Sequence, residues 1–180
     1  MKDARTVWVG GKGRGDFIGA LPIDIVEAVN QLIVDREAVV ADIRLLLPKL
    51  ADTASLENNK ALARQERDGL RGLLERCVEE NASVAQDQQA YQERYQGLAA
   101  RYVAAQERLT DIEEKLLQRA IRHETLQRFV AEFEKRPEPI EQFDETTWRC
   151  LADGVTITVD GALFRFKNGM EILVGIRAKK

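Results

Sequence analysis

The chain has 180 residues, of which 44% are hydrophobic and 32% charged, and its formal net charge is −3. This length suits one domain, or a domain with an appendage, and the mild negative charge does not favour nucleic-acid binding by the chain as a whole. The first residues do not resemble a secretion signal, and no run approaches the roughly 18 to 20 apolar residues of a membrane span. We therefore expect a cytoplasmic protein without a membrane partner.

Residues 1–21 are glycine-rich and are expected to form a flexible segment, with a short strand candidate at Thr6 to Val9. Their GGKGRG motif does not fit a phosphate-binding loop, because that loop needs GxxxxGK followed by Ser or Thr. Four basic residues near the ends of the sequence are candidate DNA contacts: Lys12, Arg14, Lys179 and Lys180. Binding through them should be weak and sensitive to salt.

The two cysteines, Cys77 and Cys150, each fall in a predicted helix. Two cysteines cannot make a zinc site by themselves, and they do not indicate a disulfide framework. We expect no metal and no cofactor.

Residues 22–55 are predicted to form the helices of a small base. The first helix should begin near Pro22, because proline suits an early helical position. Asp35 can cap a second helix, whose apolar positions continue to Pro48, where the helix should end.

A helical hairpin is predicted over residues 56–115. Ser55 is a plausible N-cap for its first helix, which should end near Glu80. Four residues are expected on the inner face of this helix: Leu70, Leu73, Cys77 and Val84. Ser83 and Gln86 have the spacing of a capping box for the next helix, so the chain should reverse just before Ser83.

The next helix carries the strongest periodic signal in the sequence. Spacings of four and three alternate along eight residues: Tyr91, Tyr95, Leu98, Tyr102, Ala105, Leu109, Ile112 and Leu116. Such a heptad seam is typical of a coiled coil. Continued, the seam reaches Arg119 and His123; either these form a polar layer or, as we favour, the helix enters a different packing environment there. A helix from Ser83 to Lys135 would be about 80 Å long, so the coiled coil should project from the base.

Residues 116–180 are predicted to contain the end of the long helix, a short helix around Trp148 and a three-stranded antiparallel sheet. Asp160-Gly161 and Asn168-Gly169 suit the tight turns of two hairpins, because both dipeptides tolerate positive φ angles. The fold class is therefore α+β and mostly α, with a long antiparallel coiled-coil hairpin and a small C-terminal sheet.

The strands of this sheet are predicted from two-residue alternation. Val155 and Ile157 alternate with threonines, as in a half-buried strand. Phe164 and Phe166 share one face, opposite Leu163, and this aromatic face should be the covered one.

Several motifs follow one another in a distinctive order: RFVAEFEK, a proline-containing link, EQFDETTW, a strand, a DG turn, FRFKNG and MEI. This order resembles the C-terminal end of large serine recombinases, the site-specific DNA integrases and transposases of phages and mobile elements. The likeness is specific over residues 140–173 and looser over residues 22–135.

The resemblance implies the zinc-ribbon and coiled-coil part of such a recombinase, in which coiled coils of different subunits touch near their tips during synapsis. The catalytic serine domain has no counterpart here, since Ser55 and Ser83 both lie at turn or capping positions, and we expect no enzyme activity. The zinc-ligating cysteine pairs of the family are absent from residues 1–25, so metal binding is not expected.

Three residues near the tip of the hairpin are candidate partner contacts: Val84, Tyr91 and Tyr95. Tyrosine suits such contacts because it combines apolar area with a polar edge. The seam also allows a second interpretation, in which the tyrosines pack inside the hairpin.

The expected function is that of a non-catalytic recombinase region that contacts recombinase subunits or a like arm through its coiled coil. In the full-length family this region also binds DNA. The alternative is a structural coiled-coil scaffold or adaptor for an unrelated protein partner. Coding sequence in frame upstream, with a catalytic serine domain and four zinc cysteines, would distinguish the two.

Overall fold

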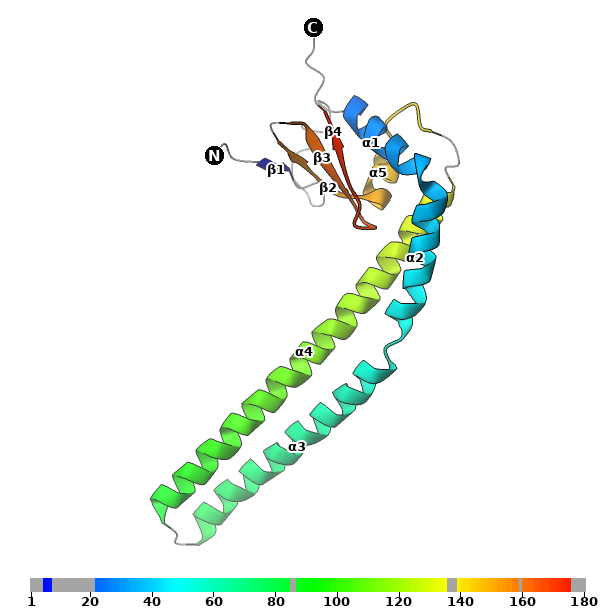
Figure 1. Cartoon of the computed structure of the whole chain (residues 1–180). Coiled ribbons are helices and arrows are strands. Elements are labelled where there is room, and N and C mark those ends of the chain that lie inside the picture. The colour runs from blue at the N-terminus through cyan, green and yellow to red at the C-terminus, as the bar shows by residue number, and fades with distance from the viewer. Residues whose placement is uncertain (1–4, 8–21, 85–86, 136–138, 159, 176–180) are drawn as a thin grey trace. The chain divides into compact units, whose positions relative to one another are not determined.

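A computed structural model describes residues 5–7, 22–84, 87–135, 139–158 and 160–175 (Figure 1). The helices are α1 (Pro22–Val34), α2 (Arg36–Ala51), α3 (Ala54–Ser83), α4 (Gln88–Glu134) and α5 (Glu145–Leu151). The strands are β1 (Arg5–Val7), β2 (Ala152–Ile157), β3 (Ala162–Phe166) and β4 (Glu171–Val174). The expected α+β, mostly helical fold class, with a long helical hairpin and a C-terminal antiparallel sheet, is confirmed.

The chain divides into two compact units. The first, here called the base, combines Met1–Lys49 with Arg122–Lys180, and the second, the hairpin, is Leu50–Ile121. The hairpin is therefore longer at both ends than the expected 56–115.

The hairpin consists of α3 and the first part of α4, which lie side by side and run in opposite directions (Figure 1). Ala63, Leu109 and Ile112 form a buried apolar cluster, against which Leu56 and Leu116 pack. These residues of α4 belong to the expected seam, and their burial confirms it in this part of the helix. Burial of this apolar stripe is the main favourable contribution to the pairing of the two helices.

Polar contacts fix the register of the two helices. Lys60 Nζ lies 3.3 Å from Glu113 Oε1, and nearer the reversal Arg94 lies 2.8 Å from Glu80. Residue numbers rise on α3 as they fall on α4, and this register places Cys77 level with Gln96 and Gly97.

The inner face of α3 differs from the expected one. Leu73 and Val84 were expected there, but they are 40% and 64% exposed. Spacings of four and three instead connect eight buried or half-buried residues: Leu56, Lys60, Ala63, Arg67, Leu70, Leu74, Cys77 and Asn81. Lys60 and Arg67 disguise this pattern in the sequence, because a long charged side chain can bury its aliphatic stem while its charge stays in contact with water.

The helix ends also differ from the expected ones. Thr53, not Ser55, is the N-cap position of α3. Ser83 ends α3 instead of capping the next helix, and its hydroxyl donates to the carbonyl oxygen of Glu79 at 2.9 Å. Pro48 lies inside α2, and the helix continues to Ala51. A proline lacks the backbone N–H of a helical hydrogen bond, so it weakens the helix locally, but it does not prevent one further turn here.

The region of Arg119 and His123 marks a change of environment along α4. Arg119 donates to the carbonyl oxygen of Asp52 at 2.7 Å, at the break between α2 and α3. The boundary between the two units falls between Ile121 and Arg122. These observations support the favoured interpretation, in which α4 leaves one packing environment and enters another.

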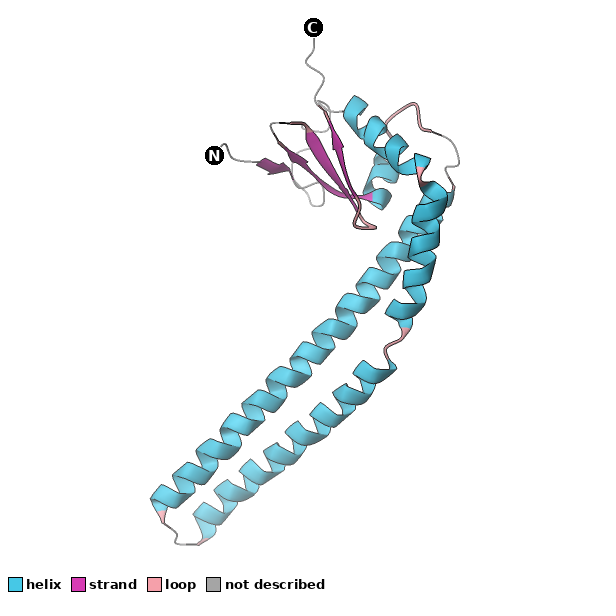
Figure 2. Cartoon of the chain, viewed as in Figure 1, coloured by secondary structure: helices cyan, strands magenta, loops and turns pink. Residues whose placement is uncertain are grey.

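In the base, all four strands form one antiparallel sheet in the order β1-β2-β3-β4 (Figure 2). The three C-terminal strands are those expected from the sequence. The fourth, β1, pairs along β2 with Val7 opposite Val155. The strand candidate at Thr6 to Val9 is thus present as an edge strand over Arg5–Val7, within the segment 1–21 that was otherwise expected to be flexible.

The aromatic face of the sheet is covered, as expected. Phe164 and Phe166 are 0% and 1% exposed, and the Trp148 ring meets Phe164 edge-on with 5.8 Å between ring centroids. Helix α1 packs against β3 and β4. On the opposite face Leu173 is 51% exposed, so one face of the sheet supplies most of the core of the base.

Candidate protein-interaction site

The tip of the hairpin is built from two helix ends that are held by local hydrogen bonds. The backbone N–H of Val84 donates to the carbonyl oxygen of Glu80 at 3.0 Å and closes the last turn of α3. Asp87 Oδ1 accepts from the backbone N–H groups of Gln89 at 2.8 Å and Ala90 at 3.3 Å. Asp87 is therefore the N-cap of α4, a position for which aspartate is among the best residues.

The three candidate contact residues lie at or near this reversal but are not equally accessible. Val84 is 64% exposed and Tyr95 is 38% exposed, whereas Tyr91 is half-buried. The rings of Tyr91 and Tyr95 lie 6.0 Å apart with a tilt of 32° between their planes. The tyrosines thus pack on each other while part of the Tyr95 surface remains open to solvent.

Val78 adds apolar surface to the same end of the hairpin, with 48% of its area exposed. It was not among the candidates from the sequence. Cys77, the residue before Val78, lies on the inner face of α3. Val78 therefore lies beside that face, on the side toward solvent. The tip therefore presents two exposed valines and one partly exposed tyrosine.

Arg94 ties the two helices together just below the tip. Its guanidinium donates to Glu80 Oε2 at 2.8 Å. A side-chain hydrogen bond with Cys77, and a second with Glu80, raise the pKa of Arg94 above its usual value. The side chain stays charged at any physiological pH and holds the helix ends in one arrangement.

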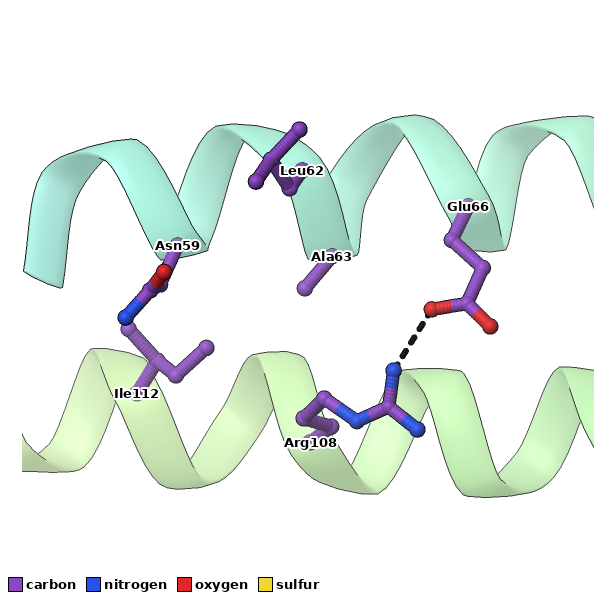
Figure 3. Close-up of a pocket in the computed structure, with 6 residues that line it drawn as sticks. All are labelled: Asn59, Leu62, Ala63, Glu66, Arg108 and Ile112. Atoms are coloured by element: carbon purple, nitrogen blue, oxygen red, sulfur yellow. Dashed lines mark hydrogen bonds and ion pairs between the residues drawn. The ribbon is translucent and has the colours of Figure 1, made fainter.

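A shallow groove of about 300 Å³ lies on one flank of the hairpin, between α3 and α4 (Figure 3). Six residues line it: Asn59, Leu62, Ala63, Glu66, Arg108 and Ile112. Figure 3 shows Glu66 and Arg108 reaching toward each other across the two helices, and their charged atoms are 2.6 Å apart. Because this ion pair satisfies the charged groups of the groove, the groove offers mainly apolar surface.

The four candidate DNA contacts, Lys12, Arg14, Lys179 and Lys180, lie outside the described residues. Within the described part of the chain, no three His, Cys, Asp or Glu side chains are grouped so that they could hold a metal ion. No described helix is long and apolar enough to cross a lipid bilayer.

Comparisons with protein-family models, with curated proteins and with solved structures gave no match to this chain. The site is therefore interpreted from its own residues.

Proposed function

We propose that this chain is a non-catalytic region of a serine site-specific recombinase system, whose helical hairpin associates with a like hairpin through its tip. The proposal combines two arguments. The tip has the chemistry of a contact surface, and the order of sequence motifs over residues 140–173 resembles the recombinase family.

The exposure of apolar side chains on a fixed backbone is the observation that carries the proposed contact. Val84 and Val78 are 64% and 48% exposed, and Tyr95 is 38% exposed, at a reversal whose helix ends are both hydrogen-bonded. A pre-organised apolar surface loses little conformational entropy on binding, which favours association. The small size of the tip favours a weak contact, of the kind that assembles only when other contacts bring the subunits together.

DNA binding enters this proposal only in the context of a larger recombinase. The net charge of −3 works against tight binding to a polyanion, because affinity for DNA comes largely from neutralised phosphates. We propose that the hairpin contributes protein contacts between subunits and that other parts of the assembly hold the DNA.

Sedimentation equilibrium of the whole chain tests the tip contact. Val84→Asp places a charge in the proposed contact and should weaken self-association about tenfold or more, since a desolvated unpaired charge opposes binding. Leu117→Asp is the matched control, because Leu117 is 60% exposed and lies in α4 well away from the tip. A chain that stays monomeric, or a Val84→Asp variant that associates as the parent does, would count against the proposed contact.

The recombination role is tested separately on the coding DNA. An upstream reading frame that encodes a serine-recombinase catalytic domain and four zinc cysteines would support it. Neighbouring genes without any such domain would favour the alternative, a structural scaffold or adaptor with an unrelated protein partner.

A further inference from the structure

The connection between α2 and α3 lies in a stretch of chain without fully buried side chains. Ile43 of α2 and Ala63 of α3 are 5% and 3% exposed. Every residue between them, 44–62, is half-buried or exposed. Because burial of apolar side chains is the main source of stability, such a stretch opens at a lower cost in free energy than the regions on either side.

The backbone of this connection is also poorly hydrogen-bonded. Pro48, in the last turn of α2, has no N–H to donate to the carbonyl oxygen of Arg44. Thr53, the N-cap position of α3, makes no side-chain capping hydrogen bond. The N–H groups of residues 54–56 have no hydrogen-bond acceptor within the described part of the chain. The helix ends on both sides of the break therefore lack bonds that normally close a helix.

One side chain of α4 bridges this break. Arg119, which is half-buried, donates to the carbonyl oxygen of Asp52 at 2.7 Å. Asp52 follows the last residue of α2 and precedes Thr53, so the bond holds the backbone at the point where one helix ends and the next begins. A hydrogen bond from a charged donor is stronger than one between neutral groups.

Helix α4 has no comparable weak point beside the break. It runs without interruption from Gln88 to Glu134, and residues 113–121 contain neither glycine nor proline. Most of these residues are of types with high helix propensity, namely Glu, Lys, Leu, Gln, Arg and Ala. The two sides of the hairpin therefore differ in local stability at this level.

We propose that residues 44–62 open and close as a local unit while α4 stays helical, and that the hydrogen bond from Arg119 is the latch that keeps this unit closed. The buried cluster of Ala63, Leu109 and Ile112 lies beyond the segment, so it stays packed when the segment opens. Opening frees the chain between α2 and α3 without breaking α4. This conformational device depends neither on the tip contact nor on a role in recombination.

Hydrogen exchange of backbone amides in the whole chain tests the proposal, because each amide reports the opening that exposes it. In the parent protein, residues 57–61 should exchange about tenfold faster or more than residues 113–121. Arg119→Ala should accelerate exchange at residues 57–61 about three- to tenfold, as expected for loss of one charge-assisted hydrogen bond. Alanine favours the helix, so residues 113–121 should keep their rates to within about twofold.

Arg108→Ala is the matched control, since it removes another arginine of α4, whose ion pair with Glu66 is exposed. It should change exchange at residues 57–61 less than about twofold. Far-UV circular dichroism confirms that both variants are folded. The proposal is overturned if residues 57–61 exchange as slowly as residues 113–121 in the parent, if Arg119→Ala has no more effect there than Arg108→Ala, or if Arg119→Ala accelerates both segments equally.

Discussion

Arg122 donates a hydrogen bond of 2.6 Å to the carbonyl oxygen of Lys167. A second hydrogen bond, of 3.1 Å, runs from the same guanidinium to the carbonyl oxygen of Asn168. Both carbonyls belong to the turn between β3 and β4, and Arg122 belongs to α4, so one side chain fixes the helix to the sheet inside the base. Two donors on a planar guanidinium define an orientation as well as a distance.

Replacing Arg122 by alanine should destabilise the base by about 1.5 to 3 kcal/mol, since hydrogen bonds from a charged donor to partly buried acceptors are lost. Urea unfolding can be followed by fluorescence of Trp148 in a Trp8→Phe background, because these are the two tryptophans of the chain. Arg128→Ala is the control: among the residues that the structure describes, Arg128 pairs with Glu124 alone, on an exposed helical surface, and its loss should cost less than about 0.5 kcal/mol. Equal losses in both variants would contradict the role given to Arg122.

Phe166 lies in the core of the base with 1% of its surface exposed. Phe166→Ala should therefore lower the free energy of unfolding by about 3 to 5 kcal/mol, as expected for removal of a buried aromatic ring. Leu173, on the open face of the same sheet, is 51% exposed, and Leu173→Ala should cost less than about 1 kcal/mol. A loss below about 1 kcal/mol for Phe166→Ala would show that the aromatic face is not the core.

Two glycines should respond in opposite directions to substitution by alanine. Gly161 has a φ of +154°, and an added Cβ would lie 2.3 Å from the carbonyl oxygen of Val174, so Gly161→Ala should destabilise the base. Gly69 lies inside α3, and its added Cβ would meet nothing within 4 Å. Gly69→Ala should therefore raise the stability of the hairpin by about 0.5 to 1 kcal/mol. Thermal melting of the two variants checks both signs, and a stabilising Gly161→Ala would rule out the turn geometry.

A hydrogen bond from Arg67 lowers the pKa of Asp68 below its usual value of 3.8. A carboxyl with a lowered pKa in the folded state stabilises the hairpin above its unfolded pKa, and this contribution is lost as the pH falls through the folded pKa. Carboxyl NMR titration should show Asp68 titrating at lower pH in the parent than in Arg67→Gln. An Asp68 pKa that does not rise in Arg67→Gln would show that the hydrogen bond is not its cause.

The sequence patterns were sufficient to predict the helices and strands in which apolar residues recur at a regular spacing. The seam of α4 from Ala105 to Leu116 could be predicted because its apolar residues are uninterrupted. The face of α3 could not, because Lys60 and Arg67 occupy inner positions and a nearby leucine, Leu73, lies outside them. Long polar side chains at seam positions can be recognised in a sequence only when the partner helix is known.

The exact helix ends and the pairing at the edge of the sheet could not be predicted from the sequence pattern either. Ser83 and Asp87 are both good N-caps, and only the position of the reversal decides that Asp87 is used. The pairing of β1 with β2 joins segments about 150 residues apart, and no local pattern predicts such a contact.

Tip-to-tip contact can be measured most directly as a distance between spin labels at position 84. Cys77→Ala and Cys150→Ala remove both cysteines, and Val84→Cys then carries the single label. Contact through the tips predicts a label-to-label distance of roughly 10 to 20 Å, close to the spacing of packed helices plus the labels. A self-associated chain in which no distance below about 40 Å is found would contradict the proposed tip contact.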